Sequence, residues 1–315
     1  MNLVLLAAEL VAGFILLIKG ADFFVEGSSS VAKMLRIPSL IIGMTIVAMG
    51  TSLPECAVSV TASLAQQNEL AIANVVGSNI FNLMVVCGVC CLFCPLAVKK
   101  STLLKEFPFS VAIALLLMGF GITSMVVGHL EGVILLIVFG GFILWMIFSA
   151  LRARKQGEEV AEEEYETLPV WKCLIFIIGG MIAIKFGGDF VVDSASQIAE
   201  RFGMSANLVG LTIVAFGTSL PELVTSIVAA RKKEVDMALG NVIGSNIFNI
   251  LFVLGIAAAI SPVAFTMENI IDIVILALMS VLVWIFAWSK NKLVLWEGAV
   301  MLLCYGGYFG YICMR

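Results

Sequence analysis

Long apolar stretches alternate with short polar segments along the whole chain. A membrane-spanning helix needs about 20 consecutive, mostly apolar residues. The stretches that satisfy this requirement cover residues 3–20, 38–64, 70–96, 106–127, 130–150, 169–187, 207–230, 236–260, 270–288 and 294–313. They number ten, five in each half of the chain. The predicted fold class is therefore an all-α polytopic membrane protein with ten transmembrane helices.

The composition supports the same class of protein. Hydrophobic residues make up 61% of the chain and charged residues 13%, whereas a soluble domain is close to half apolar and a quarter charged. The net charge of −4 says little, because an acidic segment at 151–168 supplies much of it, and we expect a solvated linker there. No basic run suited to nucleic acid is present. The first apolar stretch lacks a preceding positive region, so we expect a retained span and not a signal peptide.

The most polar part of the pattern occurs twice. Residues 43–82 align with residues 210–249 without a gap, and about 22 of the 40 paired positions are identical. Self-similarity at one long period indicates a duplicated unit. The identical positions concentrate in two motifs, Gly-Thr-Ser-Leu-Pro-Glu at 50–55 and 217–222, and Gly-Ser-Asn-Ile-Phe-Asn at 77–82 and 244–249. Polar and helix-breaking residues repeat more faithfully than lipid-facing ones, which packing alone does not explain.

The duplication predicts two repeats of opposite orientation. A unit of five spans enters the membrane from the other side when it is repeated in tandem, and cytoplasmic loops carry an excess of Lys and Arg. The basic residues that follow the odd-numbered spans are Lys33, Arg36, Lys99, Lys100, Lys105, Arg152, Arg154, Lys155, Arg231, Lys232, Lys233, Lys290 and Lys292. We therefore expect both termini outside and the 151–168 linker in the cytoplasm. Residues 1–150 and 169–315 would form an inverted repeat, as in secondary transporters.

Each copy of the first motif should break its helix near the middle of the membrane. Pro54 has no N–H for the carbonyl of Gly50, and its ring crowds that carbonyl, while glycine loosens the backbone. Gly217 and Pro221 repeat the arrangement, so helices 2 and 7 are expected to be broken. Irregular backbone at this depth is tolerated only where protein or a wet cavity meets it. The freed carbonyls near Ala48 are therefore candidate oxygen ligands.

Glu55 and Glu222 end the two copies of this motif, inside apolar stretches. A carboxylate at the bilayer centre costs about 2.5–3.5 kcal/mol on insertion scales. Two carboxylates about 6 Å apart would also repel by roughly 3 kcal/mol at an effective dielectric constant near 20. Neither stretch offers a Lys or Arg partner near its motif. The sequence therefore predicts that mobile cations or protons lie between the two acids, and hard oxygen ligands suit Ca²⁺ and Na⁺.

Hydroxyl and amide side chains accompany the two acids at helical spacing. Thr51 and Glu55 are four residues apart and share a helix face, and Ser78 and Asn82 repeat that spacing in the next span. The remaining members of this polar set are Ser52, Thr218, Ser219, Ser245 and Asn249. Two interpretations are open for these residues. They add oxygens to a cation site, or they hydrogen-bond between helices, as small polar residues do in membranes.

The doubled motifs resemble the alpha repeats of the cation/Ca²⁺ exchanger superfamily, the sodium/calcium exchangers, and most of all their prokaryotic members. The resemblance covers essentially the whole chain. It implies alternating access around central sites that either Na⁺ or Ca²⁺ fills, with Glu55 and Glu222 as the principal Ca²⁺ ligands, shared with Na⁺. It also implies hydroxyl or carbonyl ligands at Thr51, Ser52, Thr218 and Ser219, backbone carbonyl ligands at Ala48 and Ala215, and flanking ligands at Ser78, Asn82, Ser245 and Asn249.

Two features depart from the family pattern. Some relatives have an aspartate where this chain has Asn249. An amide is uncharged, so two carboxylates remain in the core, which leaves the coupling ratio open and weighs against a K⁺-dependent mode. The 151–168 linker is too short for the large cytoplasmic regulatory domain of animal exchangers. Regulation by Ca²⁺ through such a domain is therefore not expected.

Four cysteines, Cys87, Cys90, Cys91 and Cys94, cluster on one face of a predicted helix. A metal site is one interpretation of such a cluster. No His or acidic residue lies near these cysteines in the sequence, and small, soft side chains are common where helices touch in lipid. We expect a helix contact.

These observations predict a secondary antiporter in the plasma membrane of a prokaryote, and not an enzyme. Its expected partners are the transported Ca²⁺ and Na⁺ and the membrane lipid, with no cofactor and no obligate protein partner. A Ca²⁺/H⁺ antiporter is the nearest alternative, because a carboxyl group accepts a proton or a metal ion. A cation channel is disfavoured because one glutamate per repeat gives no ring of filter residues. An enzyme is disfavoured because the single histidine, His129, stands outside any HExxH motif.

Overall fold

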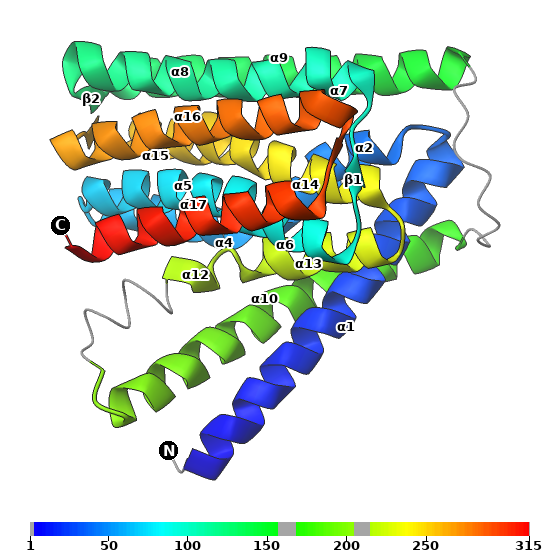
Figure 1. Ribbon diagram of the computed structural model, residues 1–315, viewed down its shortest axis with the longest axis horizontal. Helices are drawn as coiled ribbons and strands as arrows, with labels where there is room; N and C mark the ends of the chain where they lie inside the picture. Colours follow the sequence, from blue (N-terminus) through cyan, green and yellow to red (C-terminus); the bar gives the residue numbers. More distant parts are fainter. Residues whose placement is uncertain (1–2, 157–167, 205–214, 315) are drawn as a thin grey trace.

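The computed structural model describes residues 3–156, 168–204 and 215–314. Most of the predicted acidic linker and the beginning of the seventh predicted span, including Gly210, lie outside these residues. The described part is almost wholly helical (Figure 1), as the apolar pattern predicts.

The helices follow the predicted stretches in both halves. The first half contains α1 (Leu3–Leu35), α2 (Ser39–Ile42), the π-helix η1 (Gly43–Val47), α3 (Ala48–Thr51), α4 (Leu53–Leu64), α5 (Asn68–Phe81), the π-helix η2 (Asn82–Val86), α6 (Cys87–Phe93), α7 (Lys100–Leu104), α8 (Glu106–Ser124) and α9 (His129–Gln156). The second half contains α10 (Val170–Arg201), α12 (Ala215–Gly217), α13 (Leu220–Arg231), α14 (Val235–Phe248), the π-helix η4 (Asn249–Val253), α15 (Leu254–Ile260), α16 (Met267–Lys290) and α17 (Leu295–Met314).

Many of these helices are long and apolar enough to cross a membrane. Seven described helices pass a test of length and hydropathy, and an eighth span is added when the bent pair 39–51 and 53–64 is counted as one. The structure is therefore that of a multi-span membrane protein. The other two predicted spans coincide with α17 and with α12–α13, which follows the undescribed residues 205–214.

The helices of the first and sixth predicted spans continue well beyond the predicted apolar stretches. The sequence placed the ends of these stretches at residues 20 and 187, but α1 continues to Leu35 and α10 to Arg201. Polar residues such as Asp22 and Glu26 interrupt the apolar pattern without breaking the helix. Their charges are met by Lys232, whose Nζ lies 3.4 Å from Asp22 Oδ1 and 3.5 Å from Glu26 Oε2.

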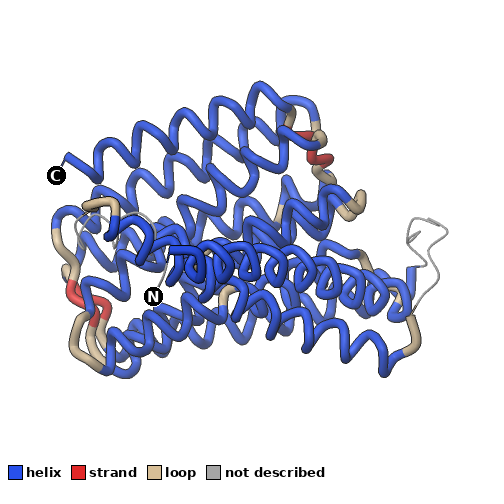
Figure 2. The backbone as a smooth tube through the Cα atoms, turned by 90° about the horizontal axis from the view of Figure 1, so that it is seen from below, coloured by secondary structure: helices blue, strands red, loops and turns tan. Residues whose placement is uncertain are grey.

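Helices α1 and α10 form an antiparallel pair that slants away from the other helices (Figures 1 and 2). Glycines placed every seven residues on α1, at 13, 20 and 27, face positions 187, 180 and 173–177 of α10. A Cβ atom added to Gly20 would lie 2.9 Å from the Ala183 Cβ, and one added to Gly180 would lie 2.8 Å from the Gly20 carbonyl oxygen. Small residues let the two backbones touch, as is common in membranes.

Two short strand pairs close the ends of the helix layers. β1 (Leu96–Ala97) pairs antiparallel with β4 (Lys292–Leu293), and β2 (Val126–Val127) pairs antiparallel with β3 (Val263–Ala264). β3 lies 167 residues after β1, which is also the offset of the repeated motifs, and β4 lies 166 residues after β2. The first pair is therefore the counterpart of the second, with the roles of the two halves exchanged.

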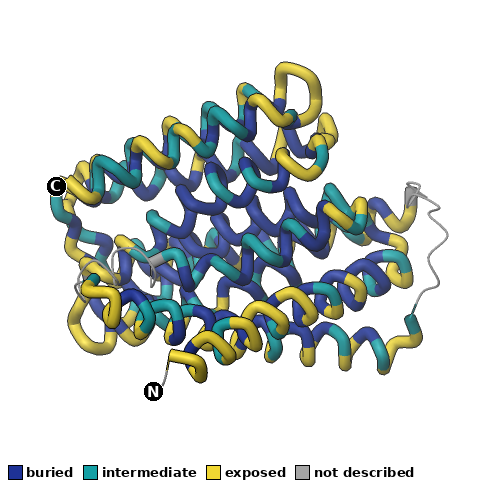
Figure 3. Tube along the Cα trace, turned by 60° about the horizontal axis from the view of Figure 1, so that its bottom comes forward, coloured by how far each residue is buried: buried dark blue, intermediate teal, exposed yellow. Residues whose placement is uncertain are grey.

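The most buried helices lie in the centre of the molecule (Figure 3). Every residue of α14 from Met237 to Phe248 is buried, and α2 and η1 cross it so closely that a Cβ atom on Gly244 would lie 2.5 Å from the Met44 Cα. Large apolar side chains on the outer faces of α1, α9 and α10 are exposed. An outer surface that exposes so many large apolar side chains suits a protein that is surrounded by lipid.

The glycine contact between α1 and α10 can be tested with neighbouring residues. Gly180→Leu should push α10 away from the backbone of α1 and cost about 1–3 kcal/mol of stability, the usual effect of overpacking. Gly179→Leu is the matched control, because a Cβ atom there meets nothing within 4 Å. Thermal unfolding of both purified variants in detergent is the measurement. Equal unfolding midpoints for the two variants would contradict the close contact.

Candidate cation site

The helix break predicted at the first motif is present. α3 ends at Thr51 and α4 begins at Leu53, with Pro54 in its first turn, and the axis bends by 49°. In the second copy α12 ends at Gly217 and α13 begins at Leu220, with Pro221 in its first turn. Glu55 and Glu222 each lie in the first turn of the helix after the break. A helix N-terminus carries partial positive charge, which favours a carboxylate there.

The two glutamates belong to one cluster, joined by reciprocal hydrogen bonds. The Ser52 hydroxyl donates to Glu222 Oε1 at 2.7 Å, and the Ser219 hydroxyl donates to Glu55 Oε1 at 3.1 Å. All four residues are fully buried. The serine of each motif therefore binds the acid of the other motif, so that residues far apart in the sequence form a single site.

The other oxygen of each carboxyl group has no partner. Glu55 Oε2 and Glu222 Oε2 are buried and accept no hydrogen bond, and the same holds for Thr218 Oγ1, Asn82 Oδ1 and Asn249 Oδ1. A buried polar atom without a partner costs about 1–3 kcal/mol. None of the ion pairs among the described residues involves either glutamate. Five unpartnered oxygens from predicted site residues, with no basic group beside them, are suited to a cation.

The remaining predicted hydroxyls line the same region. Thr51 Oγ1 lies 3.1 Å from the Val47 carbonyl oxygen and 3.1 Å from Asn241 Oδ1. Ser78 is buried beside the Glu55 carboxyl group, and Ser245 is buried with its hydroxyl 3.4 Å from the Ala48 carbonyl oxygen. The hydrogen-bonding interpretation therefore describes part of the polar set, because Thr51 and Ser245 bridge helices at the edge of the cluster.

The prediction that the Ala48 carbonyl is freed by the break is wrong. Its oxygen accepts the Ser52 N–H at 3.1 Å, in ordinary helical geometry. The physical reason is that Pro54 removes the donor that would reach Gly50, four residues earlier, and leaves the N–H of Ser52 in place. The hydroxyls of Thr51 and Ser245 also approach this oxygen, at 3.3 Å and 3.4 Å. Ala215, its counterpart, is the first residue of α12.

Four asparagines without a role predicted from the sequence support the cluster, and two of them, Asn79 and Asn246, join the two halves. The Asn79 amide donates to the Asn246 carbonyl oxygen at 3.1 Å, and the Asn246 amide donates to the Asn79 carbonyl oxygen at the same distance. Asn74 donates to the Glu55 carbonyl oxygen at 3.1 Å, and Asn241 lies 3.5 Å from that of Glu222. All four are identical between the repeats, which is the signal that could have identified them.

Asn82 and Asn249 are held by these asparagines. The Asn82 amide donates to Asn246 Oδ1, and the Asn249 amide donates to Asn79 Oδ1, both at 3.2 Å. Their amide nitrogens are therefore held by hydrogen bonds, and their Oδ1 atoms, which have no partner, are free to bind a cation. Each of the two residues begins a π-helical turn, η2 or η4. Such turns inside α-helices frequently occur at functional sites.

The cysteine cluster is a helix contact, as predicted. Cys87, Cys90 and Cys91 are buried in α6, which packs against α17. A Cβ atom added to Gly298 of α17 would lie 2.7 Å from the Cys91 Cβ. Among the described residues, no group of three or more His, Cys, Asp or Glu side chains is arranged to hold a metal.

This architecture, a multi-span helical protein with a buried acidic cluster and no basic partner, defines a membrane carrier of cations. The family of sodium/calcium exchanger proteins matches residues 5–148 and 172–314, and the chain belongs to this family. Its prokaryotic character, expected from the motifs, is confirmed by the relatives. The chain is an antiporter of this family, whose members exchange ions and are not enzymes.

Three known proteins illustrate the relationship. The chain is 42% identical over 256 residues to the putative antiporter CaxA of Alkalimonas amylolytica, which covers 79% of each protein. It is 30% identical to the sodium/calcium exchanger MaX1 of Methanosarcina acetivorans, over 94% of this chain and 95% of the relative. A solved structure of the sodium-calcium exchanger NCX_Mj, soaked with Na⁺ and Sr²⁺, superposes with a TM-score of 0.84 at 32% identity and covers 96% of this chain and 97% of that one.

The asparagine pair between the repeats can be tested by a double-mutant cycle. Asn79→Ala and Asn246→Ala should each destabilise the protein by about 1–3 kcal/mol, because each leaves a buried partner unsatisfied. Each amide donates to the backbone carbonyl of the other residue, which stays in place when the side chain is removed, so the two costs should add in the double variant. Unfolding in detergent measures the three differences. A double variant that costs clearly less than the sum would contradict two separate hydrogen bonds.

Proposed function

We propose that this protein exchanges Ca²⁺ for Na⁺ across the cell membrane by alternating access, with the cluster around Glu55 and Glu222 as the transport site. The observation that carries the proposal is the pair of fully buried carboxyl groups, each with one unpartnered oxygen and no basic neighbour. Cations supply the missing positive charge. Two carboxylates balance one Ca²⁺ or two Na⁺, so the same site can hold either ion in turn.

The proposed ligands are the residues that surround these two acids. Glu55 and Glu222 are the principal Ca²⁺ ligands and also bind Na⁺. Hydroxyl oxygens of Thr51, Ser52, Thr218 and Ser219, carbonyl oxygens of Ala48 and Ala215, and the side chains of Ser78, Asn82, Ser245 and Asn249 complete the set. The unpartnered oxygens of Thr218, Asn82 and Asn249 support their place in it. Gly50, Pro54, Gly217 and Pro221 act by breaking the helices.

The proposed membrane topology has ten spans in two inverted repeats of five, residues 1–150 and 169–315. The antiparallel pairing of the equivalent helices α1 and α10, together with the exchanged strand pairs, supports this orientation. The basic residues predict that both termini lie outside and that the 151–168 linker is cytoplasmic. A third Na⁺ per cycle would have to be compensated by helix dipoles, and exchange would then be electrogenic.

The coupling ion is tested by Ca²⁺ uptake into proteoliposomes. Uptake should follow an imposed Na⁺ gradient and should be negligible with a pH gradient alone, because the site is proposed to load Na⁺ in exchange for Ca²⁺. Uptake driven by the pH gradient and not by Na⁺ would instead establish a Ca²⁺/H⁺ antiporter. Bulk current without a counter-ion would contradict a carrier of either kind.

The two acids are tested by removing their charge without changing their shape. Glu55→Gln and Glu222→Gln should each abolish Ca²⁺ uptake. They should also abolish the stabilisation that Ca²⁺ gives the wild-type protein, which is about 2.7 kcal/mol at 100 times the dissociation constant. Glu69→Gln is the control, because this acid is exposed at the start of α5. Thermal unfolding with and without Ca²⁺ separates loss of binding from loss of folding, and retained uptake in either site variant would place the site elsewhere.

A further inference from the structure

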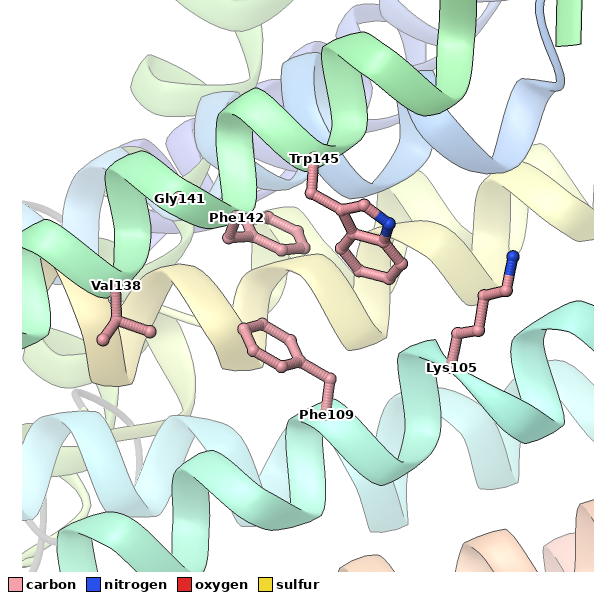
Figure 4. Close-up of a pocket in the computed structure, with 6 residues that line it drawn as sticks. All are labelled: Lys105, Phe109, Val138, Gly141, Phe142 and Trp145. Atoms are coloured by element: carbon pink, nitrogen blue, oxygen red, sulfur yellow. The ribbon is translucent and has the colours of Figure 1, made fainter. Parts of the chain in front are cut away.

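A groove of about 490 Å³ lies between α8 and α9, on the outer side of the molecule (Figure 4). We call it the α8–α9 groove. It is lined by Lys105, Phe109, Val138, Gly141, Phe142 and Trp145. Phe109 stacks on Phe142 with ring centroids 5.6 Å apart, and these two rings with Val138 form an apolar floor.

The surroundings of the groove are lipid. α8 and α9 are two of the helices long and apolar enough to span a membrane. The flanking face of α9 exposes Ile137, Leu144 and Phe148 at 67%, 56% and 66%. In a bilayer such side chains contact acyl chains, so an apolar chain and not water fills a groove between them.

One end of the groove is polar and basic. Lys105 immediately precedes α8, and Figure 4 places its amine and the indole nitrogen of Trp145 at the same end of the groove. Neither nitrogen has a hydrogen-bond or ion-pair partner among the described residues. Trp side chains favour the depth of the lipid headgroups. A free ammonium and an indole N–H here are two donors for an acceptor-rich, negatively charged group.

Exposed basic side chains gather around this end. α8 begins and α9 ends at the same end of the molecule (Figure 1), which brings Arg152, Arg154 and Lys155 of α9 to the side where Lys105 and Lys100 lie. All five side chains are exposed, and none forms an ion pair with a described residue. Basic pockets between transmembrane helices bind anionic lipid headgroups.

We propose that the α8–α9 groove is a binding site for one anionic phospholipid of the surrounding bilayer. One acyl chain lies along Phe109, Val138 and Phe142 and over Gly141, where the absent side chain leaves room. The phosphate accepts hydrogen bonds from the Lys105 ammonium and the Trp145 indole N–H. The ion pair selects an anionic headgroup, and the apolar floor holds the chain without selecting a headgroup.

Two adjacent glycines provide a sharp test of the acyl-chain position. Gly140 and Gly141 are neighbours in α9, and a Cβ atom added to either meets nothing within 4 Å, but only Gly141 lines the groove. Gly141→Leu should fill the groove and prevent lipid retention, whereas Gly140→Leu should retain lipid as the wild type does. Native mass spectrometry of the full chain, delipidated in detergent and titrated with dioleoylphosphatidylglycerol or dioleoylphosphatidylcholine, measures the bound lipid.

The preference for an anionic headgroup is tested by the same native mass spectrometry with the variant Lys105→Gln. The wild type should prefer phosphatidylglycerol to phosphatidylcholine by about fivefold, which corresponds to one lysine near the membrane surface. Lys105→Gln, an exposed change that leaves the helices intact, should reduce this preference to about one. Lys100→Gln, which does not line the groove, should reduce the preference less than Lys105→Gln, and an equal reduction by both variants would contradict a direct contact with Lys105.

The outcomes separate the alternatives. Equal retention of both lipids by the wild type would overturn an anionic site, and lipid retention by Gly141→Leu equal to that of Gly140→Leu would overturn the groove as its place. Neither result depends on transport, so the lipid site and the proposed ion exchange can fail independently.

Discussion

The structure depends on one electrostatic constraint, the burial of two acids without a basic partner. Glu55 and Glu222 are both fully buried, and a serine hydroxyl from the opposite repeat meets one oxygen of each. A hydroxyl donor and a helix N-terminus stabilise a carboxylate by a few kcal/mol at most. Desolvation of two like charges costs more than this. A proton or a metal ion from outside the chain would remove this cost, and the proposed transport site rests on that requirement.

Duplication explains how so short a motif builds the whole site. Each copy provides a helix break, an acid in the first turn after it, and a serine that reaches the acid of the other copy. Asn79 of α5 and Asn246 of α14 also form reciprocal hydrogen bonds between the two copies. Because the serine that binds each glutamate comes from the other copy, neither half contains the complete cluster. Motion of one half relative to the other would therefore change both ends of the cluster together.

The sequence predicted the helix breaks and the two acids beside them better than the contacts that support them. Pro54, Glu55 and their copies stand out because a broken helix and a carboxylate are costly in lipid. The roles of Asn79 and Asn246 could not be predicted in the same way, since an amide in a membrane helix is ambiguous until its partner is known. The continuation of α1 beyond residue 20 could not be predicted for a related reason, because Lys232, which meets the charge of Asp22, is distant in sequence.

The aromatic side chains beside the proposed transport site also form a wall of the α8–α9 groove. Phe142 lies next to Phe139, with ring centroids 6.4 Å apart, and Phe139 packs against Phe248 at 5.7 Å. Phe248 is the residue before Asn249, where η4 begins. Packed interiors transmit strain because they contain few voids. An acyl chain in the groove therefore presses on the same layer that supports Asn249. A continuous series of ring contacts, from Phe142 through Phe139 to Phe248, thus connects a lipid bound in the groove to Asn249, a ligand of the proposed cation site.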